Sequence, residues 1–185
     1  MANLFTLPHR LDRATRTVRA IVETPAGHGS KFNYRPESGL FELHGVLPAG
    51  MTFPMAFGFV PDTLADDGDP IDILVIADET LPVGCMASVK LLGVIEAVQT
   101  ERDGTSNRND RLIGRIEKSR MYADVDDLDC LGRAMVDELC RFFETYNALK
   151  GKTFAVTAIS DPVRACALIA EATNGADGKV SETMA

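Results

Sequence analysis

The stretch Asp67-Gly68-Asp69-Pro70-Ile71-Asp72-Ile73-Leu74-Val75 places three carboxylates directly around the start of an apolar run. Gly68 permits a tight turn, and Pro70 fixes its backbone angle φ without needing a partner for an N–H group. The residues from Ile71 to Ala77 are nearly all apolar and predict a buried strand. The sequence therefore predicts a turn that holds carboxylates at the edge of a rigid element.

Carboxylates held close together at the edge of a core repel one another unless protons or cations lie between them. Mg²⁺ is the usual partner, because it takes oxygen ligands and keeps waters that can bridge to phosphate. Taken alone, an acidic run is more often a solvated turn, but the buried strand that follows favours a metal site. The spacing does not match a calcium-binding EF-hand loop.

The sequence predicts further strands on both sides of this stretch. Alternating residues from Thr17 to Glu23 indicate one strand, and the runs Lys31 to Tyr34 and Leu40 to Leu47 indicate a hairpin. The prolines within Phe53 to Pro61 predict an extended segment with little strand pairing. The apolar run from Met86 to Val98 predicts a long buried strand.

The pattern changes in the second half of the chain. Gln99 to Asn109 is polar and predicts a loop, which leads into a short strand from Arg111 to Ile116. From Asp126 to Leu149, apolar residues recur at steps of three and four and predict one amphipathic helix. Thr153 to Ile159 predicts a last strand.

A shorter helix is predicted to close the chain. Asp161 supplies an N-cap before Pro162, and the helix should end near Ala172, before Asn174-Gly175. We expect a single domain over residues 1–174 and a frayed tail over 175–185. These elements predict an α+β fold, most simply a small barrel or strongly bent sheet with helices on one side.

Composition excludes several classes of protein. The 185 residues include 19 Lys and Arg against 27 Asp and Glu, a net charge of −8, with 45% hydrophobic residues and 6% aromatics. This argues against a disordered chain and against a nucleic-acid binder, which would need basic or stacking surfaces. No apolar run approaches a bilayer span or a secretory signal, so we expect no membrane partner and a cytoplasmic location. The four cysteines form no Cys-x-x-Cys pair and suit a reduced compartment.

The order of these motifs resembles the soluble, metal-dependent (family I) inorganic pyrophosphatases over about Val18 to Ile169. The resemblance rests on the acidic signature and on further stretches in the same order: Ile21 to Pro25, the Lys31 strand, Glu37 to Gly39, Phe53-Pro54, Phe57 to Phe59, Asp62 to Leu64 and Arg141 to Tyr146. It implies a small closed OB-like β-barrel and a homo-oligomer, commonly a hexamer in bacterial members. It also implies Mg²⁺-dependent hydrolysis of pyrophosphate to two phosphates by a metal-activated water.

The resemblance also implies roles for individual residues. Asp67 and Asp72 would bind the activating metals, and Glu23 would hold a further metal that arrives with the substrate. Two metals clamped between carboxylates lower the pKa of a shared water and neutralise the phosphate that it attacks. The implied site is catalytic Asp69; substrate-binding Lys31, Arg111 and Tyr146; and metal-binding Glu23, Asp67 and Asp72.

Six positions in the implied site differ from the family's pattern: Asn33, Gly45, Phe53, Phe57, Asn109 and Asn147. Each lost charge-assisted hydrogen bond to phosphate is worth about 1.5–3 kcal/mol, so several losses reduce turnover by many powers of ten unless they are replaced. The candidate replacements are Arg35, Arg108, Arg111, Arg115, Lys118, Arg120, Lys150 and Lys152.

Two alternatives follow from these departures. One is a homologue that hydrolyses another phosphoanhydride, and the other is a catalytically weak or inactive oligomeric scaffold. A P-loop ending at Gly151-Lys152-Thr153 is excluded, because its first glycine would fall at Tyr146 and it would follow a helix. The sequence thus predicts an inorganic diphosphatase whose activity depends on replaced phosphate contacts.

Overall fold

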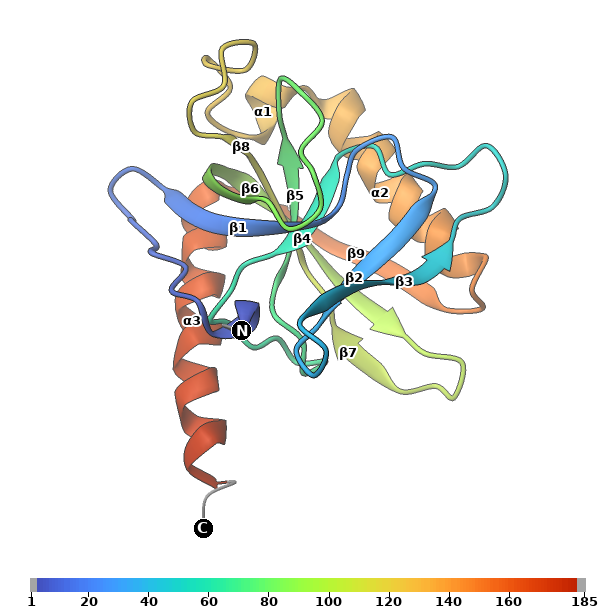
Figure 1. Ribbon diagram of the computed structural model, residues 1–185. Helices are drawn as coiled ribbons and strands as arrows, with labels where there is room; N and C mark the ends of the chain where they lie inside the picture. The colour runs from blue at the N-terminus through green and yellow to red at the C-terminus, as the bar shows by residue number, and fades with distance from the viewer. Residues whose placement is uncertain (1–2, 183–185) are drawn as a thin grey trace.

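The computed structural model describes residues 3–182 (Figure 1). A short 3-10 helix precedes nine strands and three α-helices. The elements in chain order are η1 (Leu4–Thr6), β1 (Thr17–Thr24), β2 (Ser30–Arg35), β3 (Leu40–Val46), β4 (Ala56–Phe59), β5 (Asp72–Ile76), β6 (Met86–Thr100), β7 (Ser106–Arg108), β8 (Arg111–Ile116), α1 (Leu128–Leu131), α2 (Arg133–Ala148), β9 (Thr153–Ser160) and α3 (Pro162–Glu182).

Five strands close into a ring. They are hydrogen-bonded in the order β1-β4-β5-β8-β6, and β6 pairs with β1 to complete the circle. All pairs are antiparallel except β5 with β8. The β2–β3 hairpin forms a separate two-stranded sheet, and β7 and β9 extend the second half of β6. The predicted α+β fold with a closed OB-like barrel is therefore confirmed.

Strand β6 belongs both to the barrel and to the sheet extension formed with β7 and β9. Its first residues pair with β1, and its last residues pair with β7 and β9. The strand changes register between Leu91 and Gly93, where Gly93 has a φ of 153° and a side chain would meet the Ser160 carbonyl oxygen at 2.5 Å. The loop predicted over Gln99 to Asn109 is wrong in part, because β6 continues to Thr100 and returns as β7.

The segment from Phe53 to Pro61 is also not as predicted. Its central residues form β4, which pairs with β1 on one side and β5 on the other. The prolines at 54 and 61 lie outside Ala56–Phe59, so they remove no hydrogen bond from the ladder. Gly58 lets the backbone of β4 approach β1 closely, because a Cβ atom there would lie 1.9 Å from the Ile21 carbonyl oxygen.

The helices differ from the prediction at their ends. The helix predicted from Asp126 is broken at Gly132, whose φ of 96° separates α1 from α2. Asp161 caps α3 as predicted, with its Oδ1 accepting a hydrogen bond from the Arg164 N–H at 2.9 Å. Helix α3 continues past Asn174-Gly175 to Glu182 and is longer than α2. Residues 183–185 of the predicted tail lie outside the described residues.

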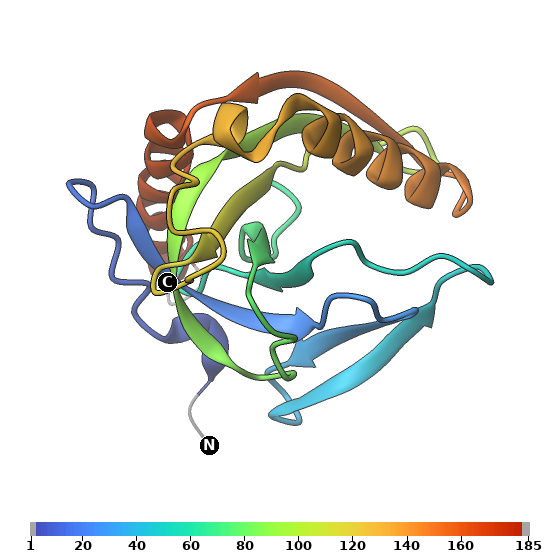
Figure 2. The ribbon, with the colours of Figure 1, turned by 90° about the horizontal axis from the view of Figure 1, so that it is seen from above.

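The core has two main parts. Apolar side chains of β1, β5 and β8 pack with Ala165, Leu168 and Ile169 of α3. A second cluster packs Val136, Leu139 and Phe143 of α2 against the barrel and β9. Figure 2 shows α2 and β9 along one side of the molecule and the β2–β3 hairpin along the other. The two helices thus cover the barrel and leave its mouth to the loops and the hairpin.

We expect Gly58→Ala to lower the free energy of unfolding by about 3 kcal/mol, because β1 and β4 must separate to admit the added methyl group. Urea unfolding followed by circular dichroism measures this loss. Gly45→Ala is the matched control on β3, since a Cβ atom there meets nothing within 4 Å. Equal losses in the two variants would show that the close contact at Gly58 does not limit the packing.

Candidate active site

A cleft of about 430 Å³ opens at the mouth of the barrel, beside the β2–β3 hairpin. Residues from β1, β2, β5, β6, β8 and α2 line it, together with the loop before β5 and the turn after α2. Segments far apart in the sequence therefore meet at one place. All seven residues of the implied site line this cleft: Glu23, Lys31, Asp67, Asp69, Asp72, Arg111 and Tyr146.

The acidic side of the cleft is built by the loop between β4 and β5. Gly68 adopts a φ of 89°, and the Asp67 Oδ1 atom accepts a hydrogen bond from the Asp69 N–H at 3.2 Å. Thr63 fixes the loop at its base, because its hydroxyl donates to the Val60 carbonyl at 2.7 Å and accepts from the Ile71 N–H at 3.0 Å. These contacts hold the loop's carboxylates at the start of β5.

Glu23 completes this acidic side from the end of β1. Its side chain is buried, and its Oε1 atom accepts a hydrogen bond from the Tyr34 N–H at 2.7 Å. Desolvation raises the pKa of Glu23 to about 7, and the nearby Asp72 and Asp69 charges add to this rise. Desolvation also raises the pKa of Asp67, again with contributions from Asp72 and Asp69. Desolvation and the neighbouring carboxylates therefore outweigh the charges of Lys31 at Glu23 and of Arg111 at Asp67.

Lysines line the opposite side of the cleft. Lys31 of β2 lies with its Nζ atom 5.0 Å from the centre of the Phe57 ring. Lys150, in the turn after α2, is hydrogen-bonded to the Tyr146 hydroxyl one helical turn earlier. Burial lowers the pKa of Lys150, and the charge of Lys152 lowers it further. This crowding of like charges makes the turn a favourable place for an anion.

The β6–β7 hairpin supports this lysine-bearing turn. The Arg102 Nε–H donates to the Lys150 carbonyl oxygen at 2.7 Å. Lys152 forms an ion pair with Glu101, with 2.7 Å between Nζ and Oε2. The position of both lysines therefore depends on residues of the hairpin.

Arg111 of β8 connects the two sides of the cleft. It is only 5% exposed, and its Nη1 atom lies 2.7 Å from Oδ2 of Asp72. The same nitrogen is hydrogen-bonded to the Asn109 side-chain oxygen. The guanidinium also lies among the rings of Phe57, Phe143 and Phe154, 5.2–5.8 Å from their centres. Arg111 is thus a buried, fixed cation.

The six departures from the family's pattern differ in position, and Gly45 of β3 pairs with Lys31 without lining the cleft. Asn33, Asn109 and Asn147 line the cleft, and the Asn33 Oδ1 atom is buried without a hydrogen-bond partner among the described residues. Phe53 and Phe57 belong to the core instead, each with at most 2% of its surface exposed. The ring of Phe57 still reaches the site from below, because Lys31 and Arg111 both lie over it.

The structure also shows which of the candidate replacements for lost phosphate contacts line the cleft. Four of them line the cleft: Arg35, Arg111, Lys150 and Lys152. Arg115 instead donates hydrogen bonds to the carbonyl oxygens of residues 116, 117, 123 and 125. Sequence reasoning missed Gln99, which lines the cleft beside Glu101 and donates to it at 2.7 Å. Extending the alternation of Ile95 and Ala97 past the apolar run would have predicted this face.

The oxygen donors at the acidic side suit a hard divalent cation. The carboxylates of buried Glu23 and exposed Asp67, together with the unpartnered oxygen of Asn33, are of the ligand type that Mg²⁺ takes. Within residues 3–173, no three His, Cys, Asp or Glu side chains converge closely enough to enclose an ion. The aspartates therefore share one cleft with the cationic side chains, as expected, but do not form a closed cage by themselves.

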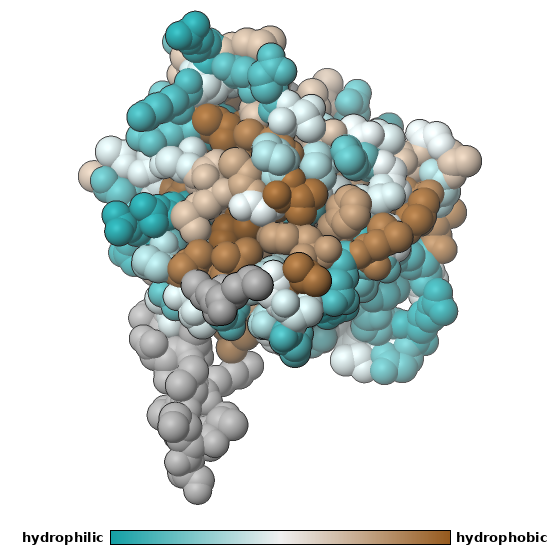
Figure 3. Space-filling view, in the orientation of Figure 1, coloured by the Kyte–Doolittle hydropathy of each residue, from teal (hydrophilic) through white to brown (hydrophobic). Residues whose placement is uncertain are grey.

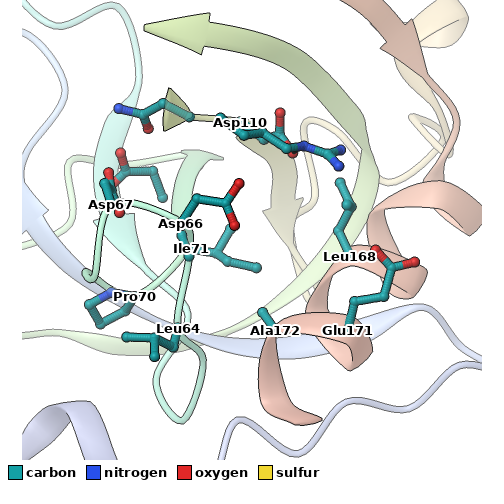
Figure 4. A pocket seen from close by; sticks show the side chains of 13 residues that line it. Leu64, Asp66, Asp67, Pro70, Ile71, Asp110, Leu168, Glu171 and Ala172 are labelled. Carbon is teal, nitrogen blue, oxygen red and sulfur yellow. The ribbon is translucent and has the colours of Figure 1, made fainter. Parts of the chain in front are cut away.

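A second cavity of about 260 Å³ lies behind the acidic loop (Figure 4). The carboxylates of Asp66, Asp110 and Glu171 line it together with apolar side chains that include Ile71 and Leu168. Arg108 neutralises part of this charge, with its Nε atom 2.6 Å from Oδ2 of Asp110. Asp110 therefore points away from the candidate site, whereas Asn109 and Arg111, two residues apart on one face of the strand, point into it.

Comparisons with known proteins agree with this geometry. A profile of the family described as inorganic pyrophosphatase matches residues 20–177. The inorganic pyrophosphatase of Thermus thermophilus is 35% identical over 175 residues, which are 90% of this chain and 97% of that protein. The inorganic pyrophosphatase of Halalkalibacterium halodurans is also 35% identical, over 84% of this chain and 93% of that protein.

The fold agrees as closely as the sequence. The crystal structure of the Thermus thermophilus inorganic pyrophosphatase superposes with a TM-score of 0.84 and 32% identity, covering 95% of this chain and 99% of that chain. Among residues 3–182, the structure has no helix both long and apolar enough to cross a membrane. With its ring of five strands, its acidic cleft and these similarities in place, the chain belongs to the inorganic pyrophosphatase family.

Proposed function

We propose that this protein hydrolyses inorganic pyrophosphate to two phosphates, with Mg²⁺ as its cofactor. One observation carries the proposal: a single cleft is lined both by the carboxylates of Glu23, Asp67 and Asp69 and by Lys31 and the cations of the turn after α2. Such an arrangement binds a polyanion and a divalent cation together. The proposed catalytic unit is the domain over residues 1–174.

Glu23, Asp67 and Asp72 are the proposed metal ligands. Their support is the gathering of these carboxylates in one cleft, since a divalent ion there offsets the desolvation, and the smaller charge repulsion, that raise the pKa values of Glu23 and Asp67. When bound, Mg²⁺ supplies Lewis acidity that activates water and neutralises phosphate charge.

The chain's own groups position the reactants and move the proton. Asp69, exposed on the loop, orients the attacking water and accepts its proton as the water oxygen bonds to one phosphorus. The bridging oxygen then leaves with the second phosphate. Lys31 and Arg111 hold phosphate oxygens by charge, and the Tyr146 hydroxyl holds one by a hydrogen bond.

Two lysines of the turn after α2 compensate, in this proposal, for the charge missing at Asn147. Lys150 and Lys152 lie in the cleft beside Asn147 and bring the positive charge that Asn147 lacks. Tyr146 orients Lys150, because the two side chains are hydrogen-bonded and the Lys150 Nζ atom lies 4.0 Å from the centre of the tyrosine ring. These two lysines are the proposed replacements for lost phosphate contacts.

We expect Asp69→Asn to lower kcat for Mg²⁺-dependent phosphate release from pyrophosphate by about a hundredfold or more, because an amide cannot accept the proton. A colorimetric phosphate assay, with and without EDTA, measures the rate. Asp66→Asn is the matched control, because Asp66 lines the second cavity and not the cleft. Its kcat should stay within twofold of the wild type. A folded wild-type protein without Mg²⁺-dependent turnover would refute the proposal and favour a scaffold, or another phosphoanhydride if a substrate panel is cleaved faster.

Lys150→Gln should raise the KM for pyrophosphate about tenfold or more and change kcat less, because the lysine contributes binding charge before and during the reaction. Steady-state kinetics at saturating Mg²⁺ separates the two constants. Lys118→Gln removes the same charge from an exposed position outside the cleft and should leave KM unchanged. A similar KM in both variants would remove Lys150 from the proposed site.

A homo-oligomer, with the hexamer as the specific expectation, is part of the proposal. Leu40, Leu43 and Val46 of β3 are 59–72% exposed. Figure 3 shows hydrophobic residues gathered on the surface over the region of β2 and β3. Exposed apolar groups of this kind favour burial between subunits. Light scattering should give six times the mass of the 20.0 kDa chain, and a monomer would contradict the expectation.

A cytoplasmic location is also proposed, in keeping with four cysteines that form no disulfide.

A further inference from the structure

We propose that Arg111 takes the place of one of the two activating metal ions, so that the protein binds a single divalent ion before its substrate arrives. This inference rests on the proposed function and concerns the part of the cleft formed by β5, β6 and β8. In this part of the cleft, the carboxylates of Asp72 and Glu101 already form ion pairs with Arg111 and Lys152. Among the described residues, Glu23 and the carboxylates of the acidic loop before β5 form none.

The contacts of one nitrogen atom give the first reason. The Nη1 atom of Arg111 lies 2.7 Å from Oδ2 of Asp72 and is hydrogen-bonded to the Asn109 side-chain oxygen. It also donates to the carbonyl oxygens of Asn109, at 3.3 Å, and Asp110, at 2.9 Å. Four oxygen atoms therefore gather at a positively charged group. Carboxylate, amide and carbonyl oxygens are also the ligands of a hard divalent cation.

The surroundings of Arg111 make this arrangement hard to displace. The guanidinium lies near three phenylalanine rings, which favour a cation over their faces. Its Nε atom is buried without a hydrogen-bond partner among the described residues. An ion that expelled Arg111 from Asp72 would leave a buried charge without its partner, which is strongly unfavourable.

The next side chains along the same wall provide no alternative metal ligand. The Asn109 Nδ2–H donates to the Gln99 side-chain oxygen at 3.3 Å, and the Gln99 Nε2–H donates to Glu101 at 2.7 Å. The Lys152 ammonium contacts both oxygens of Glu101, at 2.8 and 2.7 Å. The wall from Asp72 to Lys152 is thus a continuous chain of side-chain contacts in which each carboxylate faces a cation and the central groups are neutral amides.

The acidic loop presents the opposite situation. Within the part of the chain that the structure describes, Glu23, Asp67 and Asp69 form no ion pair, although the three line the same cleft. One oxygen of Asp72 is held by Arg111, and its other oxygen remains available to an ion on the loop side. The single ion is therefore assigned to the loop side, at Asp67 and Asp72, where waters complete its coordination because no three acidic side chains of the described residues converge there.

The test counts bound ions without measuring activity. Mn²⁺ is the probe, because it accepts oxygen ligands like Mg²⁺ and its free form is detected by electron paramagnetic resonance. Titration of the full chain without pyrophosphate should give one tightly bound Mn²⁺ per chain. A count of two or more overturns the inference, whether or not the protein is active.

Arg111→Met is the variant that is expected to gain a bound ion. The variant removes the cation and retains an apolar side chain against the rings, so a second Mn²⁺ should bind per chain. Lys31→Met is the matched control, because it removes a cation from the same cleft that is not paired with a carboxylate, and the count should remain one. Arg111→Lys retains the charge, and its count should also remain one.

Each result separates this inference from the proposed function. Two ions in the wild type, with normal pyrophosphate turnover, would refute the inference and leave the function intact. One ion in the wild type without turnover would refute the function alone. If Arg111→Met binds only one ion while folded, as judged by circular dichroism, Arg111 does not occupy a cation's place. If that variant does not fold, the wild-type count decides.

Discussion

Repulsion between carboxylates at the mouth of the barrel is the constraint on which the site depends. The barrel buries Glu23 and holds the loop with Asp67 and Asp69 beside it, so desolvation and mutual charge raise the pKa values of Glu23 and Asp67 together. Such a cluster does not persist on a loosely held loop. Here the pairing of β1 with β6 closes the ring, and Thr63 anchors the loop on both of its sides. The stability of the barrel thus maintains a local arrangement that is unfavourable without a cation.

Much of the fold could be predicted from the sequence because the strongest patterns are local. The continuous apolar runs at β5 and β6 and the apolar spacing of three and four residues in α2 predict these elements from local sequence alone. Failures occurred where long-range contacts decide the structure. Nothing local to Phe53 to Pro61 indicates that Gly58 will lie against the backbone of β1, and this contact makes the segment a paired strand. The break at Gly132 escaped notice because apolar spacing continues on both sides of it.

The candidate site shows the same division. Asp67, Asp69 and Asp72 of the acidic signature line one cleft, since those residues are neighbours in the chain. The sequence could not select among the candidate cations, because each of them reaches the cleft by tertiary packing. Lys150 does so because α2 lies against the barrel beside β9, whereas Arg108 is drawn to Asp110 on the far side of β8.

The hydrogen bond from Arg102 to the Lys150 carbonyl has a consequence for how this protein can vary. It joins a surface hairpin to the turn that carries two of the cleft's positive charges. Surface hairpins generally tolerate insertions and deletions well. In this chain, a change of length between β6 and β7 would shift Arg102 and withdraw support from the turn. In the proposed mechanism, the length of this hairpin therefore controls substrate affinity from outside the proposed catalytic and metal-binding carboxylates, and it gives protein engineers a way to alter the charge geometry of the cleft without touching them.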